Sequence, residues 1–318
     1  MQSTESFADK SDLPLVTIVT PTYNQADYLA ETIDSVLAQD YPNIEYIVID
    51  DGSTDHTGEI LKQYDGRLHW ERQANMGQAA TLNKVWAMAR GKYLTYLSSD
   101  DLLYDAAVRE LVAYLEQNPG VAMVYPDYDL IDPYSKCIKN NVAKSFDYDD
   151  MVVKQECGIG PGALFTRDCF ATVGGWQPSL KLAPDREFWM RVGLYGPIRM
   201  LGKTLAAYRM HSRSISYSEI NPGVAKEYLR VLDTYYDRTD TPPRLILRKR
   251  EAYANARILM SRVRLRNGDF PGALKEYKEA VRLYPAMKRV SVLLMLVRTA
   301  ISKPIRRVQW MIRKVIGL

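Results

Sequence analysis

Two adjacent carboxylates follow a strongly apolar segment of the sequence. Residues 93–97 have the composition of a buried strand, and a short polar segment ending in Ser99, Asp100 and Asp101 follows it. Two carboxylates side by side at the end of a buried strand repel each other, and a divalent cation would neutralise them. A metal held by carboxylates can in turn bind a diphosphate. The alternative is that these aspartates cap a helix, since residues 102–117 have a helical pattern.

Two other polar clusters also follow apolar, strand-like segments. Residues 15–20 lead into Pro21, and residues 44–49 lead into Asp50 and Asp51. Amphipathic helical patterns separate these strands, which is typical of a mostly parallel sheet covered by helices on both faces. In such sheets ligands bind beyond the carboxyl ends of the strands. Because three polar clusters are expected at one edge, the metal interpretation is favoured over the helix cap.

The chain divides into three parts by its pattern. Residues 1–13 are polar and acidic without an apolar core, so we expect a disordered segment and no signal peptide. Strands and helices alternate over residues 14–220, which predicts an α/β domain with a Rossmann-like sheet. Residues 126–156 are acidic, aromatic and irregular, and are interpreted as a loop region. From residue 221 onward the sequence predicts helices only.

The C-terminal helical region contains two recognisable segments. Residues 245–285 are similar to a single tetratricopeptide-type hairpin, which must pack on something to bury its apolar face. Residues 286–318 have eight Lys and Arg between Lys288 and Lys314, and no Asp or Glu. A basic amphipathic helix of this kind suits an anionic membrane surface. The alternative is a helix packed on the body of the protein with its basic face in solvent.

Composition limits the classes of protein to which the chain can belong. From Thr241 onward there are 19 Lys and Arg against 4 Asp and Glu, so an acidic body carries a basic tail. Three scattered cysteines exclude a disulfide framework and fit a reducing compartment. We therefore expect a cytoplasmic protein. If the basic tail binds a membrane, the protein would be peripheral at the inner face of that membrane. Nucleic acid is not expected as a partner, because no nucleic-acid-binding motif is present.

Four motifs occur in the order and spacing of family 2 glycosyltransferases. They are Val-Thr-Pro-Thr-Tyr-Asn at 19–24, Val-Ile-Asp-Asp-Gly-Ser-Thr-Asp at 48–55, Asn-Met-Gly at 75–77 and Ser-Asp-Asp at 99–101. The resemblance covers residues 13–216. It implies a GT-A fold and a nucleotide-sugar donor.

The resemblance also implies a donor site. Pro21 and Tyr23 would line the nucleoside pocket, with Tyr23 against the base, and Asn24 of the same motif joins this donor-binding set. Asp51 would accept a hydrogen bond from the base edge, which suits uracil. The alternative for Asp50 and Asp51 is a capped turn. Asn75 and Gly77 would lie near the ribose or the diphosphate, at the start of a helix.

A metal site is implied by the same comparison. Asp100 and Asp101 would bind the metal, with Asp100 also at the donor, and His211 of Tyr-Arg-Met-His would complete the ligands. Hard oxygen ligands and a diphosphate indicate Mn²⁺ or Mg²⁺. The sequence departs from the family at Ser98, where the usual Asp-x-Asp triplet has its first carboxylate. For Arg209 a phosphate contact and a place in the core both stay open.

The general base is expected at Asp185, because an acceptor hydroxyl must lose its proton as it attacks the anomeric carbon. Asp185 matches the acidic position of the family, although Pro184 replaces the common glutamate before it. The alternative is that Asp185 only caps its own helix.

Together these features predict an inverting, metal-dependent glycosyltransferase in polysaccharide biosynthesis. It would move a single sugar from a nucleotide-diphosphate sugar, with UDP as the expected nucleotide, to a hydroxyl of a glycan or polyprenyl-linked acceptor. One alternative is a catalytically degenerate scaffold that acts through its helical region, which Ser98 and Pro184 keep open. The other is a nucleotidyltransferase, although residues 21–24 lack the glycine-rich basic loop of that class.

Overall fold

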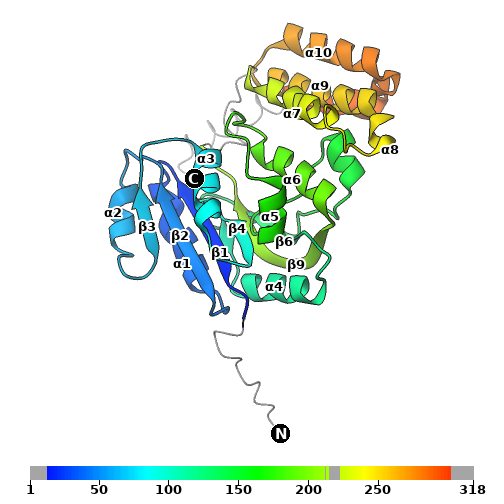
Figure 1. The fold of residues 1–318 in the computed structure, drawn as a ribbon. Helices are drawn as coiled ribbons and strands as arrows, with labels where there is room; N and C mark the ends of the chain where they lie inside the picture. The colour runs from blue at the N-terminus through cyan, green and yellow to red at the C-terminus, as the bar shows by residue number, and fades with distance from the viewer. Residues whose placement is uncertain (1–12, 212, 215–222, 302–318) are drawn as a thin grey trace, which may run out of the picture. The chain divides into compact units, whose positions relative to one another are not determined.

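A computed structural model describes residues 13–211, 213–214 and 223–301 of the chain. The predicted disordered segment, apart from Leu13, and the end of the predicted basic tail, residues 302–318, lie outside the described residues. The described chain forms two compact units, each of which contains several stretches of sequence (Figure 1). The first unit comprises residues 13–146, 158–180 and 184–211, and the second comprises residues 147–157, 181–183 and the chain from 213 to 301.

Four parallel strands form one half of the sheet in the first unit. They are β1 (Val16–Thr22), β2 (Ile44–Asp50), β3 (His69–Arg72) and β4 (Tyr93–Tyr96), in the order β3-β2-β1-β4. Thr22 pairs with Asp50, and Asp50 pairs with Arg72. Three strands therefore end side by side at one edge of the sheet.

The other half of the sheet mixes directions. Strand β8 (Leu164–Thr166) lies between β4 and β6 (Met123–Ile131) and is antiparallel to both. Strand β9 (Ile198–Arg209) runs parallel to β6, and β5 (Leu102–Leu103) pairs antiparallel with the end of β9. Parallel pairing dominates the long strands, and the predicted α/β class with a C-terminal helical region is confirmed.

The interpretation of residues 126–156 as a loop region was wrong in part. β6 continues to Ile131, β7 (Cys137–Lys139) pairs with it, and a π-helical turn η1 (Asp150–Lys154) follows. Proline and aspartate at positions 126, 127 and 129 lower the strand propensity of this segment. Pairing with β9 overrides that local preference, with irregular register on either side of Asp127.

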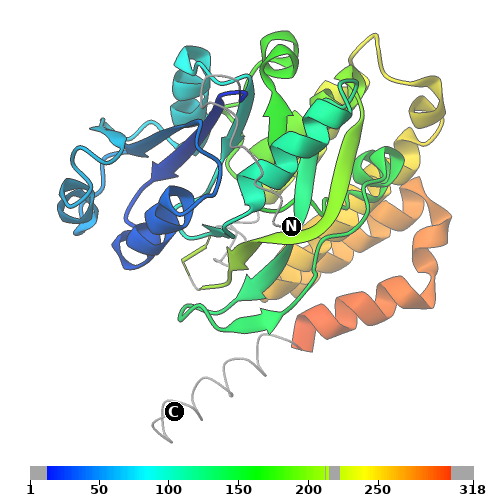
Figure 2. The same ribbon diagram turned by 90° about the horizontal axis from the view of Figure 1, so that it is seen from below.

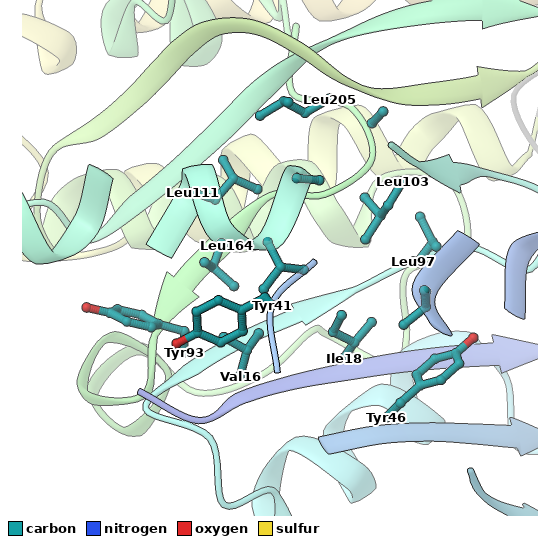
Figure 3. Packing of buried hydrophobic residues seen from close by; sticks show 14 of the residues in the cluster. Val16, Ile18, Tyr41, Tyr46, Tyr93, Leu97, Leu103, Leu111, Leu164 and Leu205 are labelled. Atoms are coloured by element: carbon teal, nitrogen blue, oxygen red, sulfur yellow. The ribbon is translucent and has the colours of Figure 1, made fainter. Parts of the chain in front are cut away.

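Helices cover both faces of the sheet. On one face α1 (Ala26–Leu37), α2 (Thr57–Lys62) and α4 (Ala107–Gln117) contribute buried side chains to one hydrophobic cluster with β1 and β2. Figure 3 shows part of this cluster, including Ile18, Leu111 and Leu164. Because neighbouring strand residues point to opposite faces, Phe165 lies on the other face from Leu164.

The second face is covered by α3 (Gln78–Met88), α5 (Arg167–Val173) and α6 (Pro184–Tyr195). Its centre is the buried Trp86, which contacts five aromatic rings: Tyr96, Phe165, Phe170, Trp176 and Phe188. This packing fixes the start of α6 and the end of β4 on one rigid support.

The second unit is helical. It contains η2 (Val224–Lys226), α7 (Glu227–Tyr236), α8 (Pro243–Ile246), α9 (Lys249–Arg266), α10 (Phe270–Leu283) and η3 (Pro285–Lys288). Residues 290–301 are also helical and are coloured orange-red in Figure 2. The hairpin α9–α10 is joined by Arg257–Glu276 at 2.7 Å and by the Asp269 cap on α10. Within the described part of the chain, no helix is long and apolar enough to cross a lipid bilayer.

Candidate active site

The polar loops that follow β1, β2, β3 and β4 share one edge of the sheet. Thr22, Asp50 and Arg72 lie in register, and Tyr96 of β4 pairs with Val19 of β1. Because parallel strands present their carboxyl ends together, residues 23–24, 51–55, 73–77 and 97–101 follow onto the same edge. The predicted convergence of polar clusters is therefore present in the fold.

The first two loops are joined by Asn24. Its side-chain Oδ1 accepts hydrogen bonds from the backbone N–H groups of Thr54 (2.7 Å) and Asp55 (3.3 Å). Its own N–H donates to Oγ of Ser53 at 2.9 Å, and its φ of 53° is left-handed. Asn24 does not cap α1; the first N–H of that helix, at Ala26, donates to the Asp55 carboxylate. These contacts make Asn24 a link between two loops.

Asp51 organises the third loop. Its Oδ1 accepts from the backbone N–H of Met76 (2.9 Å) and from Nε2 of Gln73 (2.9 Å). Its Oδ2 accepts from the N–H of Gly77 at 2.8 Å. Asp51 is buried, so these three donors offset the cost of burying its charge. The carboxylate fixes residues 73–77 at the start of α3, where the free N–H groups of a helix end favour an anion.

Gly52 supports the same loop through close backbone contact. Its φ is +82°, and a Cβ there would lie 3.0 Å from the backbone N of Asn75 and 3.3 Å from the carbonyl O of Gln73. We expect Gly52→Ala to cost about 1–2 kcal/mol in backbone strain and, by displacing this loop, to weaken binding of the nucleotide that the motifs predict. Thermal unfolding and nucleotide titration measure the two effects separately.

Gly66 provides the matched control for that substitution. Its φ is +76°, but a Cβ there meets nothing within 4 Å. Gly66→Ala should therefore show the same strain without any change in nucleotide affinity. Equal nucleotide affinity in Gly52→Ala and Gly66→Ala would contradict the role given to this contact.

Asp100 and Asp101 do not cap a helix, so the alternative interpretation is wrong. Strand β5 begins directly after them, and α4 begins only at Ala107. Oδ2 of Asp100 lies 2.9 Å from Nε2 of His211, which follows the end of β9. The ring of Tyr28 lies against the imidazole, with 4.6 Å between centroids. Two distant parts of the sequence thus bring a carboxylate and an imidazole into contact.

Asp101 lies deeper than Asp100. Its Oδ1 accepts the backbone N–H of Arg209 at 2.9 Å, and its carbonyl accepts from Oγ1 of Thr32. Burial, together with the charge of Asp100, raises the pKa of the Asp101 carboxyl well above its usual range. Among the described residues, no group of three or more His, Cys, Asp or Glu side chains is arranged to hold a metal.

The structure decides between the phosphate contact and the place in the core that the sequence left open for Arg209. The side chain is fully buried and its guanidinium donates to the chain's own acceptors. Nε donates to the carbonyl of Asp100 (2.8 Å), and Nη2 donates to Oε2 of Glu31 (2.6 Å). Nη1 donates to Oγ of Ser135 at 2.8 Å, and that hydroxyl donates in turn to Glu31. Arg209 belongs to the core and ties α1, β9 and the Asp100 turn together.

Asp185 lies in the first turn of α6, half-buried. Its Oδ1 accepts the backbone N–H of Arg186 at 2.8 Å. Burial raises the pKa of the Asp185 carboxyl above its usual value, and the Arg186 charge lowers it in part. A carboxylate with a raised pKa is a better proton acceptor, which is what a general base requires.

The structure therefore connects the predicted residues in separate groups. Asp100 contacts His211, Asp51 contacts the 76–77 amides, and Asn24 contacts the 53–55 loop. Pro21 is buried within β1, whereas Tyr23 is 49% exposed and Asn75 is exposed. Asp185 is held by its own helix. Sequence reasoning missed Glu31 and Ser135, which carry no motif and are recognisable only through Arg209.

A mixed sheet with four polar loops at one edge is the arrangement expected of a GT-A glycosyltransferase. The family model described as "Glycosyl transferase family 2" matches residues 17–171. An uncharacterized glycosyltransferase of Rickettsia prowazekii is 32% identical over 216 residues, covering 65% of this chain and 68% of that protein. The chain belongs to glycosyltransferase family 2, and it is a glycosyltransferase by descent.

Other proteins are similar to this chain in sequence or in structure. A putative teichuronic acid biosynthesis glycosyltransferase of Bacillus subtilis, TuaG, is 32% identical over 216 residues, covering 64% of this chain and 82% of its own. Residues 1–349 of TarS from S. aureus, in complex with UDP-GlcNAc, match with a TM-score of 0.61 at 15% identity, covering 87% and 93% of the two chains. The mannosyltransferase PcManGT of Pyrobaculum calidifontis, in complex with GDP-Man and Mn²⁺, matches with a TM-score of 0.59 at 19% identity. The match covers 96% of this chain and 86% of that chain. At these identities the two structures show the fold.

Proposed function

We propose that this protein is an inverting, metal-dependent glycosyltransferase that moves one sugar from a uridine diphosphate sugar to an acceptor hydroxyl. The observation that carries the proposal is the Asp100–His211 contact of 2.9 Å at the same sheet edge as the Asp51-bound loop. The Asp100–His211 pair suits a metal, and the loop bound by Asp51 presents the N-terminus of α3 to an anion.

The nucleoside would bind over the ends of β1 and β2. Tyr23 is half exposed there and offers an aromatic face to a base. Asp51 already accepts three hydrogen bonds from its own chain, so one acceptor position of the carboxylate is left for the N–H of a uracil edge. Asn75, exposed in the same loop, is assigned to the ribose or the diphosphate. Asn24 is assigned to holding this pocket in shape.

The donor set fits Mn²⁺ or Mg²⁺. Asp100 and His211 supply one carboxylate and one imidazole, and a metal of this kind takes its other ligands from water and substrate phosphates. Asp100 is assigned as the direct ligand, because Oδ1 of Asp101 is engaged by Arg209. The bound metal would supply charge neutralisation of the departing diphosphate.

In the reaction the acceptor oxygen forms a bond to the anomeric carbon as the bond from that carbon to the diphosphate oxygen breaks. The diphosphate leaves with the electron pair, and Asp185 takes the proton of the hydroxyl. Attack from the face opposite the leaving group inverts the anomeric centre.

A glycan or lipid-linked hydroxyl is proposed as the acceptor. TuaG is named for teichuronic acid biosynthesis, which supports a role in polysaccharide assembly. TarS is described with UDP-GlcNAc, which supports uridine as the nucleotide. PcManGT is described with GDP-Man, so guanosine is the nucleotide to compare with uridine. Membership of family 2 removes the nucleotidyltransferase alternative.

Thermal unfolding with UDP, GDP, dTDP and CDP, each with and without Mn²⁺, tests the donor site. A nucleotide at about 100 times its Kd should stabilise the protein by about 2.7 kcal/mol. We expect the largest shift with UDP and Mn²⁺ together, and we expect Asp100→Asn to lose the part that depends on the metal. Asp105→Asn, an exposed aspartate five positions further on, is the matched control.

Two outcomes would count against the proposal. If no nucleotide shifts the unfolding temperature of the native chain, the donor site is absent and the scaffold alternative is favoured. If UDP stabilises the protein equally without Mn²⁺ and in Asp100→Asn, the assignment of Asp100 to the metal is wrong.

A further inference from the structure

The helical residues 290–301 have apolar side chains on two faces. One face packs inside the second unit, where Val292 and Leu296 join a cluster around Ala254, Ala280 and Met287. The other face is exposed. Its apolar residues have between 42% and 69% of their surface in solvent: Val290, Leu293, Leu294, Val297 and Ile301.

These five residues follow a helical spacing, so they form a continuous stripe along one side of the helix. Single exposed apolar residues are normal on a protein surface, but a contiguous stripe marks an interaction site. We call residues 290, 293, 294, 297 and 301 the apolar stripe.

Basic residues surround the apolar stripe. Lys288, Arg289 and Arg298 are exposed beside it. In the sequence, the eight Lys and Arg between positions 288 and 314 are not accompanied by a single Asp or Glu. The occupant of this surface must therefore accept apolar side chains and positive charge together.

We propose that the apolar stripe and its basic neighbours dock on an anionic lipid bilayer. The apolar side chains would enter the boundary between headgroups and acyl chains, and the basic side chains would lie at the lipid phosphates. A second copy of the chain fits less well, because a symmetric pair would place two basic surfaces against each other. The proposal does not depend on the donor site.

Vesicle binding of the full chain tests the proposal in the absence of any sugar donor. Vesicles of equimolar phosphatidylglycerol and phosphatidylcholine are compared with vesicles of phosphatidylcholine alone in a co-sedimentation assay. We expect binding to the anionic vesicles only, and we expect it to weaken as salt is added.

Three variants separate the contributions. Leu294→Gln should lower the partition coefficient about tenfold, since it removes a leucine from the apolar boundary. Arg298→Gln, one turn further on, should lower it about fivefold. Met88→Gln is the matched control, because Met88 is 63% exposed at the end of α3 in the first unit. It should bind like the native chain.

Several results would overturn the proposal. One is the absence of binding to anionic vesicles, and another is equal binding of Leu294→Gln and the native chain. Self-association in sedimentation velocity that Leu294→Gln abolishes, without vesicle binding, would identify the apolar stripe as a contact between copies. The UDP-dependent thermal shift, measured on the same variants, reports separately on the proposed function.

Discussion

Replacing Asp185 by asparagine is expected to lower kcat about a thousandfold, because the acceptor hydroxyl loses its proton acceptor. The KM for the donor should change little, since Asp185 belongs to α6 and not to the loops assigned to the nucleotide. Steady-state kinetics with UDP-sugars, with the product anomer assigned by NMR, measure both. A product that retains the anomeric configuration would contradict the proposed direct displacement.

The pH profile provides a second measure of Asp185. Its pKa is raised above the usual 3.8, so activity should fall as the pH drops through this raised value. The same shift means that the ionised carboxylate costs folding free energy at neutral pH. Asp185→Asn should therefore not lower the unfolding temperature, and it should lack the acidic limb of the profile.

Asp168→Asn is the control for this substitution. Asp168 is an exposed aspartate in the first turn of α5, in the same unit, so the chemical change and its helix position are matched. We expect native kcat. If Asp168→Asn and Asp185→Asn have the same kcat, Asp185 is not the base.

Replacing Arg209 by methionine is expected to have the largest effect on stability, about 3 kcal/mol. The substitution leaves the carbonyl of Asp100, the Ser135 hydroxyl and the Glu31 carboxylate without their shared donor. Arg209→Lys should recover only part of the loss, because an ammonium cannot reach the three acceptors that the planar guanidinium serves. Urea denaturation of the full chain measures the change.

Arg199→Met is the control, because Arg199 lies on the same strand, β9, and is exposed. Its cost should stay within about 0.5 kcal/mol. The structural role of Arg209 would be refuted by equal costs at the two positions. If Arg209 served only to bind a phosphate, Arg209→Met and Arg199→Met would have equal costs in stability. Arg209→Met alone would then lose affinity for the donor.

The edge of the sheet could be predicted from the sequence because each motif follows a strand with a clear apolar pattern. Residues 15–20, 44–49 and 93–97 are dominated by β-branched and aromatic residues, and parallel strands present their ends together. The location of the loops after β1, β2 and β4 required no further information. The roles of their side chains stay predictions.

Other parts depend on contacts between distant residues, which no local pattern encodes. β6 contains Pro126 and Asp127 and gains its strand conformation from β9, more than seventy positions later. The sequence around Arg209 does not distinguish a phosphate-binding arginine from one in the core. The contact with Glu31, which is distant in the sequence, decides between the two roles. The contacts of Asp51 with residues 76 and 77 were missed because the donors are backbone N–H groups, which are present at nearly every position of any sequence.

The interleaving of the two units along the chain has a consequence for synthesis on the ribosome. Met151, Val152 and Val153 are buried in the second unit, where Asn255 of α9 donates to the carbonyl of Val153 from 102 positions downstream. At roughly 5–20 residues per second, this apolar segment is made many seconds before α9 exists. The nascent chain therefore carries an uncovered apolar segment until α9 has been made, about a hundred residues later.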